Sequence, residues 1–408
     1  MTWVLLSGLG LLGVALLADL VLGVRHAWAR PLPYLLGTAA SVLLTVTGAA
    51  GLAGHGARVG LDAFLGFGAA SLTVDRLSAL FLVVCFAVAA PVSLACAGWA
   101  ARSPQGPHRI RARGLGCAYA LTLASVAVVV TADHVFVFLF AWESLTLDFY
   151  LLTAHHRREA APAVVTVVLG KASGAALLVG FLLLAAATGD FTFPGFAALP
   201  HTRVRDAAFA LLVLGFAVKV GLVPVHVWLP RGYRAAPGPL RAIMAGVAVN
   251  AGFYGLWRTL DLLHQPPPWL AVLVLLLGGA TALLGIAHAT VQTDLAEVVA
   301  YSSVENAGLI TVGFGVALVG TAVGLAPLVA VGLLAATLQL VAHAIAKALL
   351  FTAVSGIEDA TGTTTLDDLR GVGHRLRVSG TGLAIGALTL AGLPLTPGSC
   401  PSGSCWKR

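Results

Sequence analysis

Nine ionisable side chains interrupt apolar stretches that are long enough to cross a lipid bilayer. They are Glu143, Asp148, Lys171, Lys219, His226, His288, Glu305, His343 and Lys347. A charge at the bilayer centre costs about 2.5–3.5 kcal/mol even on a lenient scale, so such residues are rare. Snorkelling to the membrane surface would explain one or two of them, Lys171 and His288 first. Nine spread over six segments indicate instead a series of groups that hold and release protons.

The segment FAVKVGLVPVHVWLP (216–230) adds a second signal. Pro224 follows Lys219 by five residues, and proline removes a backbone hydrogen bond inside a helix. We therefore predict that Pro224 breaks this helix and that Pro230 ends it. Broken helices at mid-membrane mark ion sites, because freed carbonyls and helix ends stabilise charge there. A simple kink is the alternative.

His343 and Lys347 are four residues apart in another apolar stretch. On a helix this spacing places both side chains on one face. Both groups exchange protons, so the pair fits a relay step. A polar pair that packs in the core is the alternative interpretation.

Composition indicates a membrane protein. Of the 408 residues, 59% are hydrophobic and only 10% are charged, whereas a soluble domain has roughly 25% charged residues. The net charge of +7 needs no nucleic-acid partner, because arginine-rich cytoplasmic loops produce it. The five cysteines form no C-x-x-C pair and no four-cysteine cluster. We therefore expect no iron–sulfur cluster, no structural zinc and no cofactor on this chain.

The ionisable residues must be positioned by membrane-spanning helices, because open sheet edges are not tolerated in lipid. A spanning helix needs about 20 predominantly apolar residues. Twelve segments qualify: 3–24, 31–53, 74–100, 114–131, 133–153, 163–188, 206–228, 237–259, 268–289, 298–318, 325–355 and 378–396. The predicted fold is an all-α, polytopic bundle of about twelve transmembrane helices.

Arginine is unevenly distributed between the connections. Fourteen arginines lie in the odd-numbered connections between predicted helices and five in the even-numbered ones. Cytoplasmic loops carry the excess of basic residues. We therefore predict cytoplasmic odd connections and an N-terminus outside, in the cell inner (plasma) membrane.

Five stretches resemble the antiporter-like membrane subunits of respiratory complex I, multisubunit cation/proton antiporters and membrane-bound nickel–iron hydrogenases. They are FVFLFAWESLTLDFYLL (136–152), AVKVGLVPVHVWLPRGYRAAPGPLRAIMAG (217–246), QTDLAEVVAYSSVENAG (292–308), AHAIAKALLF (342–351) and TGTTTLDDLRGVG (361–373). The variant YSSVENAG looks most similar to the hydrogenase-4 component B and formate hydrogenlyase type. The resemblance implies about fourteen helices with inverted repeats. It divides this chain into N-terminal helices (1–113), a first repeat (114–260), an incomplete second repeat (261–398) and an aberrant tail (399–408).

The resemblance also implies roles for individual residues. In the family, a helix-five glutamate and a helix-seven lysine form an ion pair that opens and closes, and these match Glu143 and Lys219. His343 and Lys347 match the helix-eleven histidine and lysine. The remaining matches are His226 and Pro230, at the end of the broken helix, and Glu305, in the YSSVENAG variant that points to hydrogenase-4.

Three positions depart from the family pattern. Asn250 replaces a frequent lysine, and an asparagine binds a water wire but carries no proton. Ala296 and Glu297 replace a basic pair. Asp148 is an additional acid without an assigned role.

The chain ends in GSCPSGSCWKR (398–408), where the family continues with a stretch resembling G-F-V-S-E-W-L-L. One inserted base in one possible coding sequence restores that stretch, so we expect a one-base deletion, natural or from sequencing. A genuine short paralogue is the alternative. Without the helix-twelve acid, we expect the chain alone to translocate no protons and to be less stable than a repaired version.

The favoured hypothesis is a proton-translocating membrane subunit of a hydrogenase-4-like or complex I-like redox complex. Its partners would be other membrane subunits of that assembly, and the iron–sulfur, nickel–iron or flavin cofactors would lie in partner subunits. The chain would thus belong to an oxidoreductase without carrying a redox centre. The alternatives are a subunit of a multisubunit sodium/proton antiporter and a non-functional truncated remnant. No quinone pocket is identifiable.

Overall fold

The computed structural model describes residues 1–23, 26–61, 69–102, 114–155, 160–197 and 199–392. Some predictions fall on other residues. The predicted helix break at Pro394 and Pro397 and the tail 399–408 lie outside the described residues, as do six of the arginines used to orient the chain.

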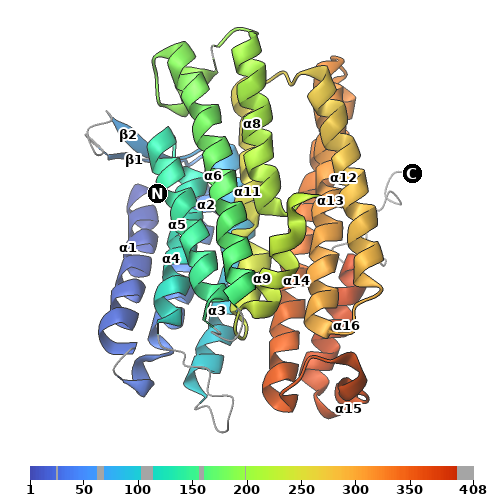
Figure 1. Cartoon of the computed structure of the whole chain (residues 1–408). Helices are drawn as coiled ribbons and strands as arrows, with labels where there is room; N and C mark the ends of the chain where they lie inside the picture. Colours follow the sequence, from blue (N-terminus) through green and yellow to red (C-terminus); the bar gives the residue numbers. More distant parts are fainter. Residues whose placement is uncertain (24–25, 62–68, 103–113, 156–159, 198, 393–408) are drawn as a thin grey trace.

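The described residues form a bundle of long, roughly aligned helices (Figure 1). The N-terminal part contains α1 (Thr2–Ala18), η1 (Asp19–Gly23), η2 (Ala27–Ala29), α2 (Leu32–Leu52), α3 (Arg76–Ala101), α4 (Leu115–Thr131), α5 (Val135–Thr153) and α6 (Ala160–Thr188). The central part contains α7 (Phe193–Phe196), α8 (Arg203–Val220), η4 (Val225–Val227), α9 (Trp228–Ala235), α10 (Leu240–Ile243), η5 (Met244–Ala248) and α11 (Asn250–Leu263). The C-terminal part contains α12 (Pro268–Ala289), α13 (Leu295–Ala322), α14 (Ala326–Thr361), η6 (Leu366–Leu369), α15 (Val372–Arg375) and α16 (Arg377–Leu390).

The helices confirm the predicted polytopic all-α fold. Among the described residues, nine helical segments are long and apolar enough to cross a membrane. The other three of the twelve predicted segments are also helical, in the shorter apolar α4, the continuous run α10–η5–α11 and α16. The spans follow from composition, because each apolar run satisfies its backbone hydrogen bonds within one helix.

One element was not expected from the sequence. Residues Ala57–Leu61 (β1) and Ala70–Val74 (β2) form an antiparallel hairpin between α2 and α3. Asp133 anchors it, because the Ser71 N–H donates to its Oδ1 over 2.8 Å. The hairpin lies beside the end of α1 that carries the N-terminus (Figure 1). It is consistent with the rule against sheet edges in lipid only because it lies in a connection, not within an apolar span.

The predicted seventh helix is broken. α8 ends at Val220, and a non-helical turn leads to the single 3₁₀ turn of η4 and then to α9. Pro224 lies in that turn, where the break was expected. The prediction that Pro230 ends the helix is wrong, because α9 continues to Ala235. Pro230 lies in the first turn of α9, where a missing N–H deprives no carbonyl of a partner.

Small residues let α12 and α13 approach closely. A Cβ added to Gly308 would lie 2.3 Å from the backbone nitrogen of Ala282, and one added to Gly285 would lie 2.4 Å from that of Glu305. Glycine at such positions is typical of helix contacts in membranes, where close backbone approach provides the packing energy.

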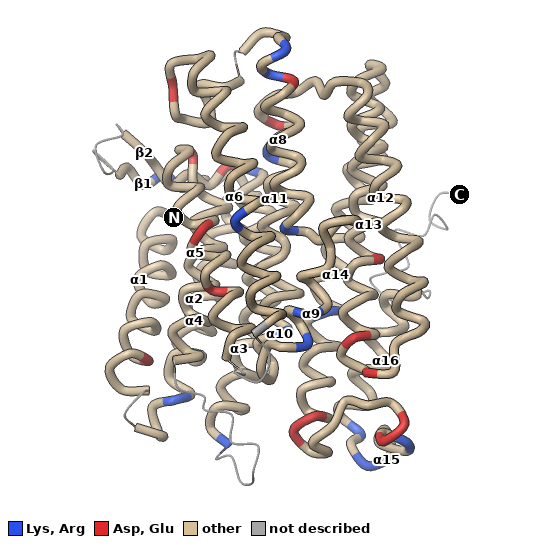
Figure 2. Tube along the Cα trace, viewed as in Figure 1, with Lys and Arg blue, Asp and Glu red and all other residues tan. Residues whose placement is uncertain are grey.

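Charged residues lie near both ends of the bundle, and several more lie at intermediate height (Figure 2). The C-terminal end of α3 and the short helix α15 both lie at the lower end, and the N-terminus of α8 lies at the upper end. Alternate connections therefore lie at opposite ends, as expected for consecutive spanning helices.

Candidate proton-transfer site

Lys219 is the last residue but one of α8. The helix stops because Gly221 adopts a left-handed conformation with φ of +81°, which glycine reaches without strain. Lys219 is only 4% exposed. Its ammonium lies 4.1 Å from the ring centroid of Phe149 and 5.4 Å from that of Trp142. Aromatic faces and the carbonyls at a helix C-terminus both favour a cation.

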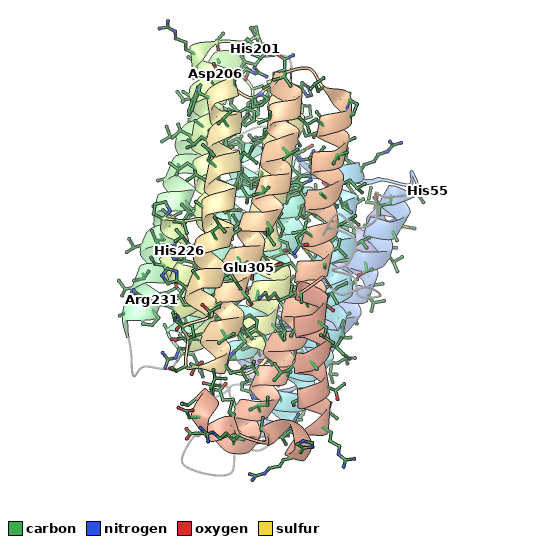
Figure 3. The ribbon with its side chains drawn as sticks, turned by 90° about the vertical axis from the view of Figure 1, so that its right-hand side faces the viewer. His55, His201, Asp206, His226, Arg231 and Glu305 are labelled. Atoms are coloured by element: carbon green, nitrogen blue, oxygen red, sulfur yellow. The ribbon has the colours of Figure 1, made fainter. Side chains whose placement is uncertain are left out.

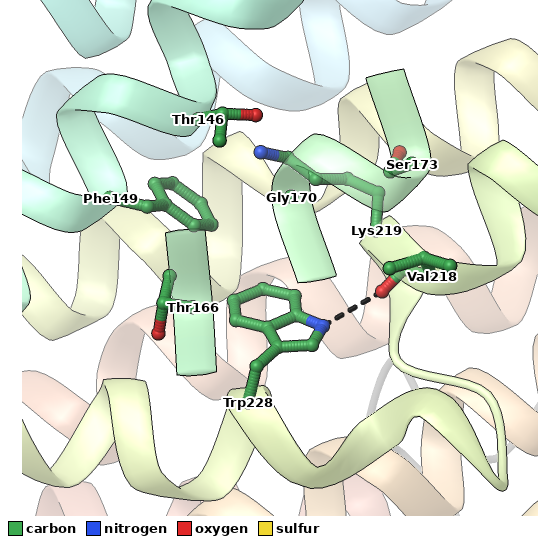
Figure 4. A pocket seen from close by; sticks show the side chains of 8 residues that line it. All are labelled: Thr146, Phe149, Thr166, Gly170, Ser173, Val218, Lys219 and Trp228. Atoms are coloured by element: carbon green, nitrogen blue, oxygen red, sulfur yellow. Dashed lines mark hydrogen bonds between the residues drawn. The ribbon is translucent and has the colours of Figure 1, made fainter. Parts of the chain in front are cut away.

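A small pocket with room for about one water molecule lies beside Lys219 (Figure 4). The indole of Trp228, in α9, donates to the carbonyl of Val218 over 2.8 Å and so joins the two halves of the broken helix. Hydroxyl groups face the same space from α5 and α6, which gives it a partly polar wall. The complete lining is Thr146, Phe149, Thr166, Gly170, Ser173, Val218, Lys219 and Trp228.

Glu143 forms an ion pair with Lys171 of α6. The two side chains are 34% and 63% exposed, respectively. Lys171 thus has a counter-ion within the bundle, which the sequence did not indicate. Among the described residues, no acid lies within ion-pair distance of Lys219. The expected Glu143–Lys219 pair is thus not formed in this conformation.

Asp148 is the acid that the sequence left without a role. It is fully buried. Its Oδ2 accepts a hydrogen bond from the hydroxyl of Ser125 in α4 over 3.3 Å, and its Oδ1 has no partner among the described residues. Asp148 and Glu143 are the two acids whose charges reach Lys219. The only sequence signal was an acid inside an apolar run, which shows that a residue is unusual but not what it faces.

Lys347 forms a second centre between α13 and α14. It is fully buried and donates hydrogen bonds to the carbonyl of Val299, over 2.9 Å, and to the hydroxyl of Ser302. Glu305 lies in α13 as well, and its charge acts on Lys347. His343 lies one turn before Lys347 on α14, and neither of its buried ring nitrogens has a partner among the described residues. His343 and Lys347 therefore lie one turn apart on α14, as their spacing predicted.

The run α10–η5–α11 lies between the two lysine centres. A Cβ added to Gly252 would lie 3.2 Å from the Cβ of Lys219, and one added to Gly246 would lie 2.8 Å from the carbonyl oxygen of Ala344 in α14. Asn250 is fully buried between these two contact points. Its amide nitrogen donates to the carbonyl of Gly246 over 2.9 Å, and its amide oxygen has no partner among the described residues.

His226 belongs to neither lysine centre. Its ring lies 6.4 Å from that of His288 in α12, which in turn stacks on Tyr301 at 5.4 Å. His226 and Glu305 lie at intermediate height in the bundle, whereas His201 and Asp206 lie at one end (Figure 3). Within the part of the chain that the structure describes, no cluster of three or more His, Cys, Asp or Glu could hold a metal ion.

The chain is similar in sequence to several known proteins. An uncharacterized protein of Mycobacterium tuberculosis is 37% identical over 331 residues, which are 80% of this chain and 51% of the relative. Hydrogenase-4 component B of Escherichia coli is 30% identical over 302 residues, 72% of this chain and 45% of the relative. The chain thus spans about half the length of these curated relatives.

Comparison of structures agrees on the fold. A chain of the membrane-bound sulfane sulfur reductase, an archaeal respiratory membrane complex, superposes with a TM-score of 0.79 and 20% identity. The superposition covers 98% of this chain and 80% of the other. Residues 132–404, about two thirds of the chain, match the family described as NADH:quinone oxidoreductase/Mrp antiporter, TM. This stretch contains both lysine centres and the broken helix, and the chain belongs to that family of membrane proteins.

Proposed function

We propose that this chain is a proton-translocating membrane subunit of a redox complex similar to hydrogenase-4 or complex I. Electron transfer would take place in partner subunits, with no redox centre on this chain. The observation that carries the proposal is the pair of buried lysines, Lys219 and Lys347. Neither forms an ion pair with a described residue. A buried lysine without a fixed counter-ion is poised to lose and regain its proton.

The proposed relay consists of the six residues named from the sequence. Lys219 exchanges protons at one centre and Lys347 at the other, and Asn250 binds the water that joins them. Asparagine cannot be ionised, so Asn250 guides a proton without storing it. The other relay members are Glu143, His226, Glu305 and His343.

The exposed ion pair supports membrane partners. Glu143 and Lys171 lie within spanning helices but remain partly exposed at the surface of the chain. Charges facing hydrocarbon cost several kcal/mol. A neighbouring membrane subunit over α5 and α6 would remove that cost.

We also propose that the arginine-rich connections face the cytoplasm, with the N-terminus outside the inner membrane.

The test is proton transport in liposomes. The chain is produced together with the membrane subunits encoded beside it, and proton flux is followed with a pH-sensitive dye under an imposed membrane potential. Lys219→Ala and Lys347→Ala should each abolish flux and leave thermal stability nearly unchanged, with Thr188→Ala, which lies in α6 outside both centres, as the control. Wild-type flux in both lysine variants would disprove the proposal.

The antiporter alternative rests on the same family, whose description includes Mrp antiporters. It predicts that flux depends on a sodium gradient and needs no electron donor. Measuring dye response with sodium replaced by choline distinguishes the two functions.

A further inference from the structure

Asp148 is a buried acid that the family resemblance leaves unexplained. No part of it is exposed, and one carboxyl oxygen has no partner among the described residues. An isolated buried carboxylate is strongly disfavoured. Either a nearby cation must compensate the charge of Asp148, or its carboxylate must take up a proton. In the second case a neighbouring group has to supply that proton.

Lys219 is placed to be that partner. Trp142, Thr146 and Phe149 recur on α5 at helical spacing and face Lys219, through the two rings and the pocket wall. Asp148 is adjacent to Phe149 on the same turn. Its other oxygen is held by Ser125 of α4, which places it between α4 and the Lys219 centre.

Glu143 is not available in the same way. Its carboxylate pairs with Lys171, and both side chains reach the surface of the chain. Glu143 therefore already has a counter-ion in this conformation, whereas Asp148 has none among the described residues.

We propose that Asp148 is an acid that exchanges a proton with Lys219, while Glu143 pairs with Lys171 in this conformation. This inference rests on the proposed function in proton translocation. In the step, an N–H bond of the Lys219 ammonium breaks and an O–H bond forms on Asp148. The nitrogen keeps the electron pair, which leaves a neutral amine and a neutral acid. Because no direct ion pair joins the two groups, the step requires a water molecule that bridges Lys219 and Asp148.

The test compares Asp148→Asn, Asp148→Glu and Glu143→Gln with Lys219→Ala in the liposome assay. Asp148→Asn keeps shape but accepts no proton, so flux should fall about a hundredfold, within the usual range for a lost acid–base group. Asp148→Glu should restore much of the flux. Glu143→Gln should retain more flux than Asp148→Asn, and thermal denaturation checks that each variant folds.

Infrared difference spectroscopy provides a second readout, which a purely structural role would not affect. A protonated carboxylic acid gives a C=O band that shifts in D₂O. That band should persist in Glu143→Gln and change in Lys219→Ala. Both variants keep Asp148, so this measurement tests the proton exchange even if Asp148→Asn fails to fold. Normal flux in Asp148→Asn with none in Lys219→Ala would overturn this inference and leave the proposed function intact. Normal flux in Lys219→Ala would also overturn this inference, and normal flux in Lys347→Ala as well would overturn the proposed function itself.

Discussion

The ammonium of Lys219 lies 4.1 Å from the centre of the Phe149 ring, whereas among the described residues no carboxylate is within ion-pair distance of it. An aromatic face attracts a cation without binding it as a carboxylate would. Lys219 can therefore be partly stabilised when charged and still release its proton.

This contact leads to a first prediction for Phe149→Leu. The substitution keeps apolar volume but removes a cation–π contact worth about 0.5–2 kcal/mol, so the charged form of Lys219 becomes less favourable. Proton flux should fall severalfold, while the melting temperature changes little. Phe149→Tyr retains the ring and is the matched control, and equal flux in the Leu and Tyr variants would contradict the role of the ring.

At the second centre, Ser302→Ala removes one of the two hydrogen bonds of Lys347. A hydrogen bond to a charged group contributes about 1.5–3 kcal/mol, so both flux and thermal stability should decrease. Ser303→Ala is the control, because the Ser303 hydroxyl is also buried in α13 but donates only to the Val299 carbonyl. A larger loss in Ser303→Ala than in Ser302→Ala would count against the assignment.

The third prediction concerns pH and the contact between α3 and α11. Burial would raise the pKa of the Asp75 carboxyl, but the hydrogen bonds and charge of Arg258, together with the hydrogen bonds of Ser78, hold it below its ordinary value. A lowered folded-state pKa stabilises the fold above the unfolded value of about 3.9. This contribution is lost as pH falls from there through the lowered value.

The variant Asp75→Asn isolates this effect. Its amide oxygen can still accept the Ser78 N–H at the start of α3, but the charge is lost. We expect a loss of about 2 kcal/mol at neutral pH. The difference in melting temperature from wild type should narrow as pH is lowered from 6 towards 3, a range that spans the ordinary aspartate value. A constant difference across that range would show that the charge is not responsible.

The fourth prediction tests the close contact of α12 and α13. Gly308→Ala would place a methyl group 2.3 Å from the backbone nitrogen of Ala282, and neither backbone can yield without separating the helices. We expect destabilisation of about 1–3 kcal/mol or more, measured by thermal denaturation in detergent. Gly279→Ala, on α12, meets nothing within 4 Å and should leave stability unchanged or slightly improved. Equal effects of the two variants would mean that the helices are further apart than the structure shows.

The positions of the helices could be predicted from the sequence because each apolar run must pair its backbone groups internally in lipid. The break after Lys219 was also predictable, since the signal is local: Gly221 and Pro224 both disfavour a continuing helix. Pro230 was misjudged because proline is compatible with a first helical turn, and whether a new helix begins there depends on its surroundings.

The partners of the charged residues were decided by the tertiary structure alone. Glu143 and Lys171 are 28 residues apart, and Asp148 and Lys219 lie on different helices. Which face of α5 meets which neighbour depends on the rotation and packing of whole helices. That arrangement comes from the sum of many contacts across the bundle, so a residue's own sequence neighbourhood reveals that a charge is buried but not which charge it faces.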